Sequence, residues 1–385
     1  MTWLIDKDVV FLNHGSFGAC PKWILNKQQE YRNRLESEPV RFMIRELETM
    51  HTKAREVLAG FTGANPADLV FVTNATTGIN TVFRSLRFMP GDEILITDHI
   101  YPACMRLLEF ICELTGARLV EASIPFPLRD PGVITDKILS AVTERTKIAL
   151  IDHITAATAI ILPVGEIVKE LDRRGVDTFV DGAHALGQIS IRLDEIGAAY
   201  YTSNCHKWLC APKSAAILHV RKDKQKGIVP AVISHAGHKA EPFSERFYWP
   251  ATYDPTPILC AADMVKEMEN HYPGGWPAIM ERNHKLCMEA RAMICRELEL
   301  PDPCSPEMVG SMSTMVLPKP EVVPVFDYKS SDPLQDRLFK EHQIEVPVWY
   351  FGKDQQRIIR ISTHLYNHKE QYRFLLDTLK PMLSP

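Results

Sequence analysis

The feature that most constrains the fold is a regular alternation of strand-like and helix-like segments between residues 44 and 220. Short runs rich in β-branched residues, such as DLVFVTN (68–74) and VDTFVDGA (176–183), are separated by helical patterns such as PACMRLLEFICELTG (102–116). Strands that alternate with helices of this length form crossover units, which build a mainly parallel sheet with helices on its faces. The sequence therefore predicts an α/β fold for this part of the chain.

The last third of the chain has a different pattern, which predicts a second, smaller α/β domain. Three strand-like runs follow two long helical segments: STMVLPK (313–319), IEVPVWYF (344–351) and RIIRIST (357–363). We expect a large domain of residues 15–260 and a small domain made of residues 1–14 and 261–385.

Charge and cysteine usage narrow the class of protein. The net charge of −4 gives no reason to expect nucleic acid or an anionic membrane as a partner. No apolar run reaches the roughly 18 residues that span a bilayer, and the acidic start MTWLIDKDVV lacks the pattern of a signal peptide. The nine cysteines include no C-x-x-C pair, and HAGH (235–238) offers two histidines without a nearby third ligand. These observations favour a cytoplasmic protein with reduced thiols and no metal.

Four polar clusters stand at the ends of predicted strands, where ligands of parallel α/β sheets bind. They are TNATTG (73–78), TDHIYPA (97–103), VDGAHALGQ (180–188) and SNCHKW (203–208). A lysine can form an imine with an aldehyde, and a carboxylate can keep a pyridinium nitrogen protonated. A hydroxyl-rich helix start can hold a phosphate, and an aromatic side chain can stack on a ring. Together these residue types favour pyridoxal phosphate as the cofactor of an enzyme.

The order of these motifs resembles the class V aminotransferase family of fold-type I pyridoxal-phosphate enzymes. Lys207 follows Asp181 by 26 positions, and both lie in motifs that match the family. FLNHGSFG (11–18) and FVTNATTGIN (71–80) are similar to the branch that contains isopenicillin N epimerase-like proteins and their cysteine lyase and desulfurase relatives. The resemblance runs from about residue 10 to the end of the chain. It implies a large domain with a seven-stranded, mainly parallel sheet, a smaller C-terminal domain, and a homodimer whose active site is shared between subunits.

The resemblance implies a role for each matching residue around the lysine. Lys207 is the Schiff-base lysine and carries the proton at the α-carbon, and Asp181 pairs with the ring nitrogen. His184 takes the position from which relatives contact the ring hydroxyl, usually with glutamine, and Tyr101 takes the ring-stacking position. Each has a plainer interpretation: a helix cap for Asp181, a core histidine for His184 and a packed aromatic for Tyr101.

The resemblance also assigns residues to the phosphate and to the substrate. The phosphate is held by residues from several segments, namely Ala75 and Thr76 in the turn, Asn204 and His206 beside the lysine, and Thr252 from the other subunit. Arg360 resembles the arginine that clamps the substrate's α-carboxylate, since a guanidinium matches a carboxylate with two parallel hydrogen bonds; the alternative is a strand-surface arginine. Asn13 and His14 are candidate substrate residues, although a structural turn explains them nearly as well. Arg41 in EPVRFM (38–43) is a further candidate.

The cofactor alone does not select the reaction. Desulfurase relatives carry a nucleophilic cysteine shortly before the residue that matches Arg360, whereas QIEVPVWYFGKDQQRI (343–358) contains none and the nearest upstream cysteine is Cys304. This departure disfavours persulfide-forming desulfurase chemistry. Elimination needs the fewest special residues, so we expect a carbon–sulfur lyase that acts on cysteine or a cysteine derivative. Epimerisation, with Tyr101 or a pocket histidine as the second acid, is the first alternative; transamination follows, and a non-catalytic cofactor-binding protein ranks last.

Overall fold

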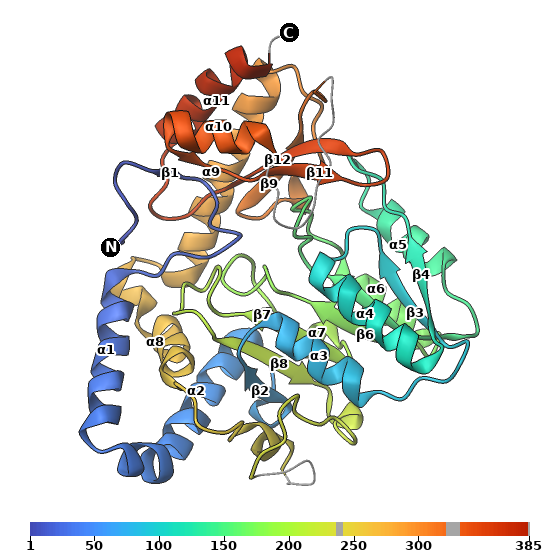
Figure 1. Cartoon of the computed structure of the whole chain (residues 1–385), viewed down its shortest axis with the longest axis vertical. Coiled ribbons are helices and arrows are strands. Elements are labelled where there is room, and N and C mark those ends of the chain that lie inside the picture. The colour runs from blue at the N-terminus through green and yellow to red at the C-terminus, as the bar shows by residue number, and fades with distance from the viewer. Residues whose placement is uncertain (236–241, 321–331, 384–385) are drawn as a thin grey trace.

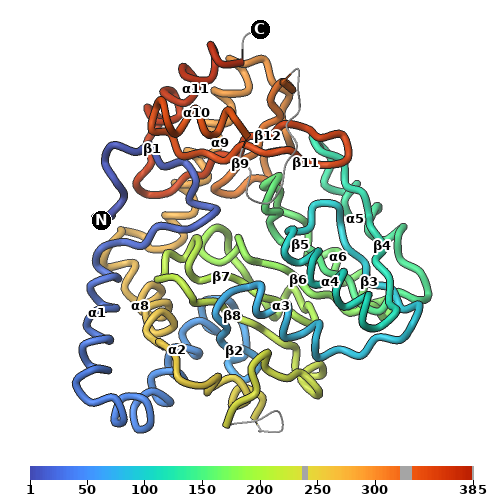
Figure 2. The backbone as a smooth tube through the Cα atoms, viewed as in Figure 1, coloured from blue at the N-terminus to red at the C-terminus, as the bar shows by residue number. Residues whose placement is uncertain are grey.

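The computed structural model describes residues 1–235, 242–320 and 332–383, so residues 236–238 of the HAGH segment lie outside the described part. Figure 1 shows a large lower domain built around one sheet and a smaller upper domain that contains α10, α11 and the β9–β11–β12 strands. The trace in Figure 2 shows the N-terminal segment passing beside the small domain at β1 before it enters α1. None of the helices in these ranges is long and apolar enough to cross a membrane.

The large domain is built on a seven-stranded sheet with the order β2-β8-β7-β6-β5-β3-β4. Strand β8 runs antiparallel to both of its neighbours, and the remaining pairs in the sheet are parallel. The strands are β2 (Leu69–Val72), β3 (Glu93–Thr97), β4 (Arg118–Ala122), β5 (Thr146–Asp152), β6 (Asp177–Asp181), β7 (Tyr200–Asn204) and β8 (Ala216–Val220). The predicted α/β fold with a mainly parallel seven-stranded sheet is confirmed.

The residue pattern of the strands explains why both faces of this sheet are covered. In β3, Ile94 and Ile96 belong to the core on one face, whereas Leu95 belongs to the core on the other face. This alternation follows from the two-residue period of a strand, and a strand packed on both sides is buried at every position. The edge strand β4 instead exposes Arg118 and Glu121, which suits a strand that has a neighbour on one side.

Helices cover this sheet, and capping residues fix where individual helices begin and end. The Asn74 side chain accepts the Thr77 N–H at 2.8 Å and begins α3, while Gly116 in a left-handed conformation ends α4. The helices are α1 (Lys22–Ser37), the π-helix η1 (Arg41–Glu46), α2 (Leu47–Thr62), α3 (Ala75–Ser85), α4 (Pro102–Thr115), α5 (Gly132–Ser140), α6 (Val164–Arg173), α7 (Leu193–Ile196) and α8 (Thr256–His271), with short 3-10 turns at η2 (Pro66–Asp68), η3 (Lys222–Lys224), η4 (Phe243–Phe247) and η5 (Pro306–Met308). Helix α1 was not among the predicted elements, because it fully buries only Ile24 and Gln28 and so lacks an apolar stripe.

The small domain packs helices against a three-stranded antiparallel sheet of order β11-β12-β9. Its elements are α9 (Gly275–Glu297), β9 (Met312–Val316), α10 (Pro333–His342), β10 (Ile344–Glu345), β11 (Val348–Phe351), β12 (Gln356–Ser362) and α11 (Lys369–Leu383). The N-terminal strand β1 (Val10–Phe11) pairs with β10 in this domain, which supports the placement of residues 1–14 in the small domain.

The boundary predicted at residue 260 falls inside α8, whose Met264 and Met268 pack in the large-domain core. Along the next helix, α9, Ile279 still belongs to that core, whereas Met293 and Ile294 belong to the small-domain core. We therefore propose that the chain changes domain along α9, because one continuous helix contributes to both cores.

Candidate active site

The candidate site is a cavity of about 650 Å³ at the carboxyl ends of the central strands, the edge at which ligands of such sheets bind. Its large-domain side comes from the start of α3, the loop after β3 and the ends of β5, β6 and β7, and its small-domain side comes from β11 and β12. The cavity brings together nine residues that the sequence had predicted, namely Ala75, Thr76, Tyr101, Asp181, His184, Asn204, His206, Lys207 and Arg360.

Lys207 lies on the turn after β7 and contacts a histidine. Its amine nitrogen Nζ lies 3.0 Å from Nε2 of His184, and the Trp208 indole N–H donates to Nδ1 of the same ring at 3.3 Å. Burial, followed by the nearby Arg360 guanidinium, lowers the pKa of Lys207 to about 8. About a tenth of the amine is then uncharged at pH 7, far more than for an ordinary lysine.

The N-terminal turn of the chain supports the backbone of Lys207. A Cβ on Gly18 would lie 2.4 Å from the Lys207 carbonyl oxygen, so this close approach requires glycine. His14 Nε2–H donates to the same carbonyl at 3.1 Å, and its Nδ1 accepts from the Tyr366 hydroxyl at 2.7 Å. Burial lowers the pKa of His14 to about 3, so the ring is neutral. His14 does not line the cavity; both ring nitrogens serve the structural turn, which was the plainer interpretation of its motif.

His14 also belongs to a buried cluster with Cys210 and His364, whose possible ligand atoms lie within 4.8 Å of one another. The two imidazole rings stack with centroids 4.2 Å apart and planes inclined by 13°. An imidazole nitrogen binds an ion through a lone pair in the ring plane. Since one ion cannot lie in two stacked, nearly parallel planes, the geometry of this cluster suits packing better than a metal.

Two carboxyls lie side by side at the ends of β5 and β6, because Asp152 and Asp181 are partners in the sheet register. Asp181 Oδ1 accepts the Ala183 N–H at 2.9 Å, and its Oδ2 accepts the Cys104 thiol at 3.7 Å. Burial raises the pKa of both carboxyls; the charge of Asp181 raises that of Asp152 further, whereas the Ala183 N–H and the Lys207 charge act to lower that of Asp181. We therefore assign the proton of the pair to Asp152 and the negative charge to Asp181.

The start of α3 forms an anion-binding turn at the cavity. Asn204 Oδ1 accepts the Ala75 N–H at 2.9 Å, which fixes the first residue of the helix, and Thr76 follows in the cavity lining. His206 Nδ1–H donates to the Ala215 carbonyl at 2.9 Å, so its Nε2 is left for a ligand. A helix N-terminus offers backbone N–H groups and the positive end of the helix dipole, and this turn therefore suits a phosphate.

Arg360 enters the cavity from β12 on the small-domain side. Its Nη1 donates to the Ala156 carbonyl and its Nη2 to Ser16 Oγ at 3.1 Å, while Nε is buried without a partner. The Trp349 ring lies 5.0 Å from the guanidinium carbon, and across the described residues no carboxylate forms an ion pair with Arg360. Burial lowers its pKa to about 10, so the group stays charged at neutral pH. A buried guanidinium without an anion suits the carboxylate of a ligand.

Asn13 acts on Arg360 and does not line the cavity. Its Oδ1 accepts from Ser16 Oγ at 2.6 Å and from Arg360 Nη2 at 3.5 Å, and its Nδ2 donates to Glu345 Oε1 at 3.0 Å. The predicted substrate residue is thus placed one contact behind the cavity, where it orients Arg360.

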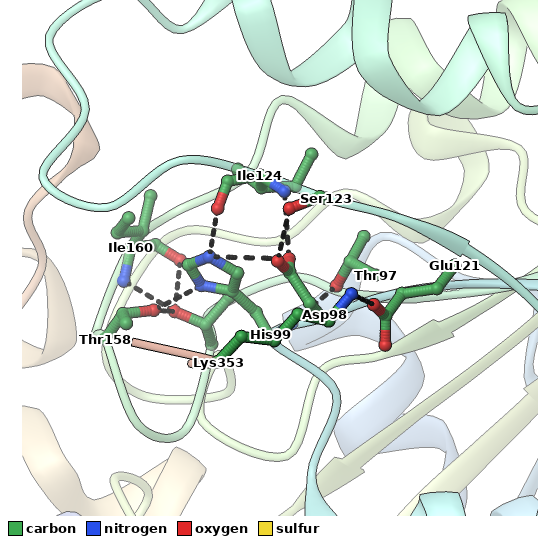
Figure 3. Close-up of polar contacts among 10 residues, drawn as sticks. Thr97, Asp98, His99, Glu121, Ser123, Ile124, Thr158, Ile160 and Lys353 are labelled. Carbon is green, nitrogen blue, oxygen red and sulfur yellow. Dashed lines mark hydrogen bonds and ion pairs between the residues drawn. The ribbon is translucent and has the colours of Figure 1, made fainter. Parts of the chain in front are cut away.

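The loop that carries Tyr101 is anchored by a buried polar network (Figure 3). His99 Nε2–H donates to the Ile124 carbonyl at 2.9 Å, and its Nδ1 accepts from Thr158 Oγ1 at 2.6 Å. Asp98 accepts from Ser123 Oγ at 2.8 Å and from the Ile124 N–H at 2.9 Å. This network anchors the loop between β3 and α4, and Tyr101 on the same loop lines the cavity.

Arg41 and Thr252 lie outside this cavity. Arg41 is exposed on η1 and forms ion pairs with Glu46 at 3.5 Å and with Glu38 at 3.9 Å, so the chain's own fold does not bring it to the site. Thr252 is exposed, and its expected contribution to the other subunit stays a prediction.

Sequence reasoning missed several residues of the site. Asp152 lies at the end of the strand-like run KIALIDH (147–153), at the same sheet edge as Asp181. A polar residue at this strand end was therefore visible in the sequence. Trp208 gave no such signal, because an apolar neighbour of the lysine reads as core. Trp349 and Phe351 also line the cavity, and they read as ordinary residues of a small-domain strand.

The fold and the site define an α/β enzyme with a buried lysine at the strand ends of its large domain. The chain belongs to the class-V aminotransferase family, whose model matches residues 10–245. It is 32% identical to the probable chloroplastic L-cysteine desulfhydrase of Arabidopsis thaliana, over 98% of this chain and 84% of that protein. It is 31% identical to isopenicillin N epimerase of Streptomyces clavuligerus, over 98% of this chain and 95% of that protein.

The fold is also that of solved structures. The chain has a TM-score of 0.81 to cysteine desulfurase from Thermococcus onnurineus NA1, at 19% identity and with 99% and 96% of the two chains covered. These matches confirm the family and the fold predicted from the sequence. A further match with a TM-score of 0.76 and 20% identity, a C-DES mutant with glycine covalently linked to the PLP cofactor, together with the family supports pyridoxal phosphate as the cofactor.

Proposed function

We propose that this protein is a pyridoxal-phosphate-dependent carbon–sulfur lyase that acts on cysteine or a cysteine derivative by α,β-elimination. The observation that carries the proposal is the placement of Lys207, Asp181 and Arg360 around one cavity in a chain that is 32% identical to an L-cysteine desulfhydrase. An amine, an anionic carboxylate and an unpaired guanidinium are the groups that this cofactor and an α-amino acid require.

The residues of the cavity fit the cofactor. When bound, pyridoxal phosphate draws electrons from the substrate's α-carbon. The anionic Asp181 would keep the ring nitrogen protonated, and the start of α3 would hold the phosphate. Burial lowers the pKa of His206 to about 4, so its ring is neutral in the cofactor-free protein, and it would donate to the phosphate from Nε2 after taking up a proton. His184 faces Lys207 at 3.0 Å and would contact the ring oxygen, and Tyr101 would stack on the ring.

The chain's own groups divide the work of elimination. Arg360 holds the α-carboxylate and so orients the α C–H bond, and Lys207 takes the α-proton in its uncharged amine form. The C–S bond then breaks, and the sulfur leaves with the electron pair and takes up a proton. Water hydrolyses the remaining three-carbon fragment to pyruvate and ammonia.

The cysteines argue for a lyase over a persulfide-forming desulfurase. No cysteine occurs among the described residues that line the cavity. The Cys104 thiol donates to Asp181 beside the cavity, but burial and the Asp181 carboxylate hold its pKa well above its usual range. A thiol that stays protonated is a poor nucleophile.

Epimerisation is the second candidate, and two observations favour it. The chain is 31% identical to an isopenicillin N epimerase, and Tyr101 lies in the cavity as a potential second acid. Burial raises the pKa of the Tyr101 phenol, so it keeps its proton at neutral pH. Transamination ranks third, and a non-catalytic cofactor-binding role ranks last.

We also propose a cytoplasmic homodimer in which Thr252 of one subunit completes the phosphate site of the other. The exposure of Thr252 is compatible with such a contact, and all nine cysteines are free thiols, as expected in the cytoplasm.

A product assay tests the reaction. The cofactor-loaded protein is incubated with cysteine, S-substituted cysteines and other amino acids, and pyruvate, sulfide and chiral inversion are measured. We expect pyruvate and a sulfur product without inversion. Inversion without keto acid would transfer the assignment to the epimerase, and a protein that binds cofactor but gives neither result would remove the enzyme proposal.

A further inference from the structure

The hydrogen bonds of His184 determine which of its nitrogens carries the proton. The indole N–H of Trp208 is a donor only, and it donates to His184 Nδ1 at 3.3 Å. Nδ1 must therefore present its lone pair, and the proton of the neutral ring lies on Nε2. Burial holds the pKa of His184 well below its usual range, which excludes the doubly protonated ring.

This tautomer restricts the charge of the lysine. His184 Nε2–H points to Lys207 Nζ at 3.0 Å, so the amine has to accept the hydrogen bond. An uncharged amine has a lone pair and accepts, whereas an ammonium group is a donor only. A charged Lys207 would place two donors face to face, or would force His184 into the tautomer that opposes the Trp208 N–H.

We propose that Trp208 is a positioning residue that selects the Nε2–H tautomer of His184, which disfavours the ammonium form of Lys207 and so increases the share of uncharged, reactive amine. The inference deepens the proposed function, because an uncharged amine is the form that captures an aldehyde and takes the α-proton. Trp208 is fully buried and lies outside the cavity lining, so it acts through His184 without touching a ligand.

Several charged groups act on the same amine and have to be separated from the effect of Trp208. Arg360 on β12 disfavours the ammonium form and Asp181 on β6 favours it, while Cys104 on α4 keeps its proton and carries no charge. None of these three groups contacts Trp208 through a hydrogen bond in the described part of the chain, so a change of Trp208 alters the His184 tautomer while it leaves their charges in place.

The test measures the protonation of Lys207 in the full-length, cofactor-free protein. Competitive labelling with acetic anhydride across a pH series, read by mass spectrometry at the Lys207 peptide, gives the pH of half-maximal reactivity. In Trp208→Phe no indole N–H faces His184 Nδ1. The ring proton can then move to Nδ1, and Nε2 can accept a hydrogen bond from the ammonium group of Lys207. We expect the midpoint to rise by about one pH unit, the size of one net hydrogen bond.

Trp276→Phe is the matched control. Trp276 is also buried, and its indole N–H donates to the Met264 carbonyl at 3.2 Å, away from the cavity lining. This variant loses a similar bond and should leave the Lys207 midpoint unchanged. An equal shift in both variants, or none in Trp208→Phe, would overturn the inference.

A second measurement keeps the inference testable if Trp208→Phe does not fold. Nitrogen NMR of the wild-type protein labelled with ¹⁵N-histidine, with His184 assigned by its loss in His184→Gln, reports which ring nitrogen carries the proton. The Nε2–H form supports the inference and the Nδ1–H form overturns it. Capture of pyridoxal phosphate by the wild type is scored separately, so failure of the cofactor proposal can be told apart from failure of this one.

Discussion

The two sides of the cavity differ in how their polar groups are satisfied. On the large-domain side, Lys207, Asp181 and Ala75 each have a protein partner, so the groups are held in place before any ligand arrives. On the small-domain side, the wall is aromatic, and Arg360 Nε is buried without an acceptor in the described ranges. The polar groups of the large-domain side are therefore paired within the protein, whereas the small-domain side presents one strong hydrogen-bond donor, Arg360 Nε, for a ligand.

This difference suggests a division between the constant and the variable part of the reaction. A cofactor is the same in every turnover, and a preorganised set of partners holds it at low entropic cost. A substrate enters and leaves, so its side of the cavity offers one charge for the carboxylate shared by all amino acids and an apolar wall for the rest. Substitutions on the large-domain side should therefore abolish the chemistry, and those on the small-domain side should change substrate affinity.

The largest effect is expected for Lys207→Ala, because it removes both the covalent attachment point and the base. We expect kcat to fall by at least about 10³-fold. Borohydride reduction followed by mass spectrometry should find no cofactor on the chain. Lys340→Ala, at an exposed ion pair with Asp336 on α10, is the control and should keep full activity. Attachment at another lysine in Lys207→Ala would break the assignment.

Asp181→Asn should come next, since a neutral amide cannot hold the ring nitrogen protonated. The variant should retain bound cofactor, because the phosphate turn and Lys207 are unchanged, while kcat falls by about 10²–10⁴-fold. Solvent exchange of the substrate's α-proton, followed by NMR, measures the affected step directly. Near-normal exchange would show that Asp181 does not serve the ring nitrogen.

On the opposite side, Arg360→Ala should weaken substrate binding and spare cofactor attachment. Loss of a charge-assisted pair costs about 1.5–3 kcal/mol, so KM should rise by about 10–100-fold. Arg360→Lys keeps the charge but not the fork, and it should restore only part of the affinity. Unchanged KM in both variants would remove Arg360 from the substrate site and erase the proposed division between the two sides.

The large-domain side could be predicted from the sequence because its residues occur in short motifs at strand ends. Ala75, Asp181 and Lys207 follow the ends of β2, β6 and β7, which run in the same direction and so bring their ends to one edge of the sheet. The mainly parallel sheet was predictable for the same reason, whereas its count of seven strands came from the family resemblance.

The small-domain side was harder to predict, because its contacts join distant parts of the chain. Asn13 meets Arg360 across 347 positions, and no local pattern shows whether such a residue touches a ligand or orients its neighbour. His14 was placed with the substrate for this reason, although its ring serves the backbone of Lys207. The tautomer of His184 was likewise out of reach, since it depends on the direction of one indole N–H.

A smaller effect is expected for the carboxyl pair, as a change of stability with pH. In the folded, cofactor-free protein burial raises the pKa of Asp152, so this carboxyl keeps a proton that it loses on unfolding above about pH 4. The folded state then binds more protons, and stability falls as pH rises, by up to about 1.4 kcal/mol per pH unit. Asp152→Asn removes this term, so its free energy of unfolding should fall less steeply above about pH 5.

Asp152→Asn has to be compared with the wild type at each pH, because buried histidines change the free energy of unfolding with pH in the opposite direction. The pKa of His14 is lowered to about 3, so its contribution to stability rises with pH up to its ordinary pKa of about 6.5. Both proteins share this term, and it cancels in the difference between their urea-unfolding curves across the pH series. Parallel curves would mean that Asp152 is not the protonated member of the pair.

The smallest effects are expected at the two contacts that tie the sides together. Lys353 and Glu121 form an exposed ion pair at 3.2 Å (Figure 3). The ring centroids of His99 and Phe351 lie 4.7 Å apart in an edge-to-face contact. Lys353→Ala should change the free energy of unfolding by less than about 1 kcal/mol, because an exposed pair is screened by water. Thr158→Val should cost about 1–3 kcal/mol, because it leaves His99 Nδ1 buried without its donor. Urea denaturation measures the free energy of unfolding of both variants. A larger loss of stability in Lys353→Ala than in Thr158→Val would mean that the surface ion pair, and not the buried histidine, holds the two sides of the cavity together.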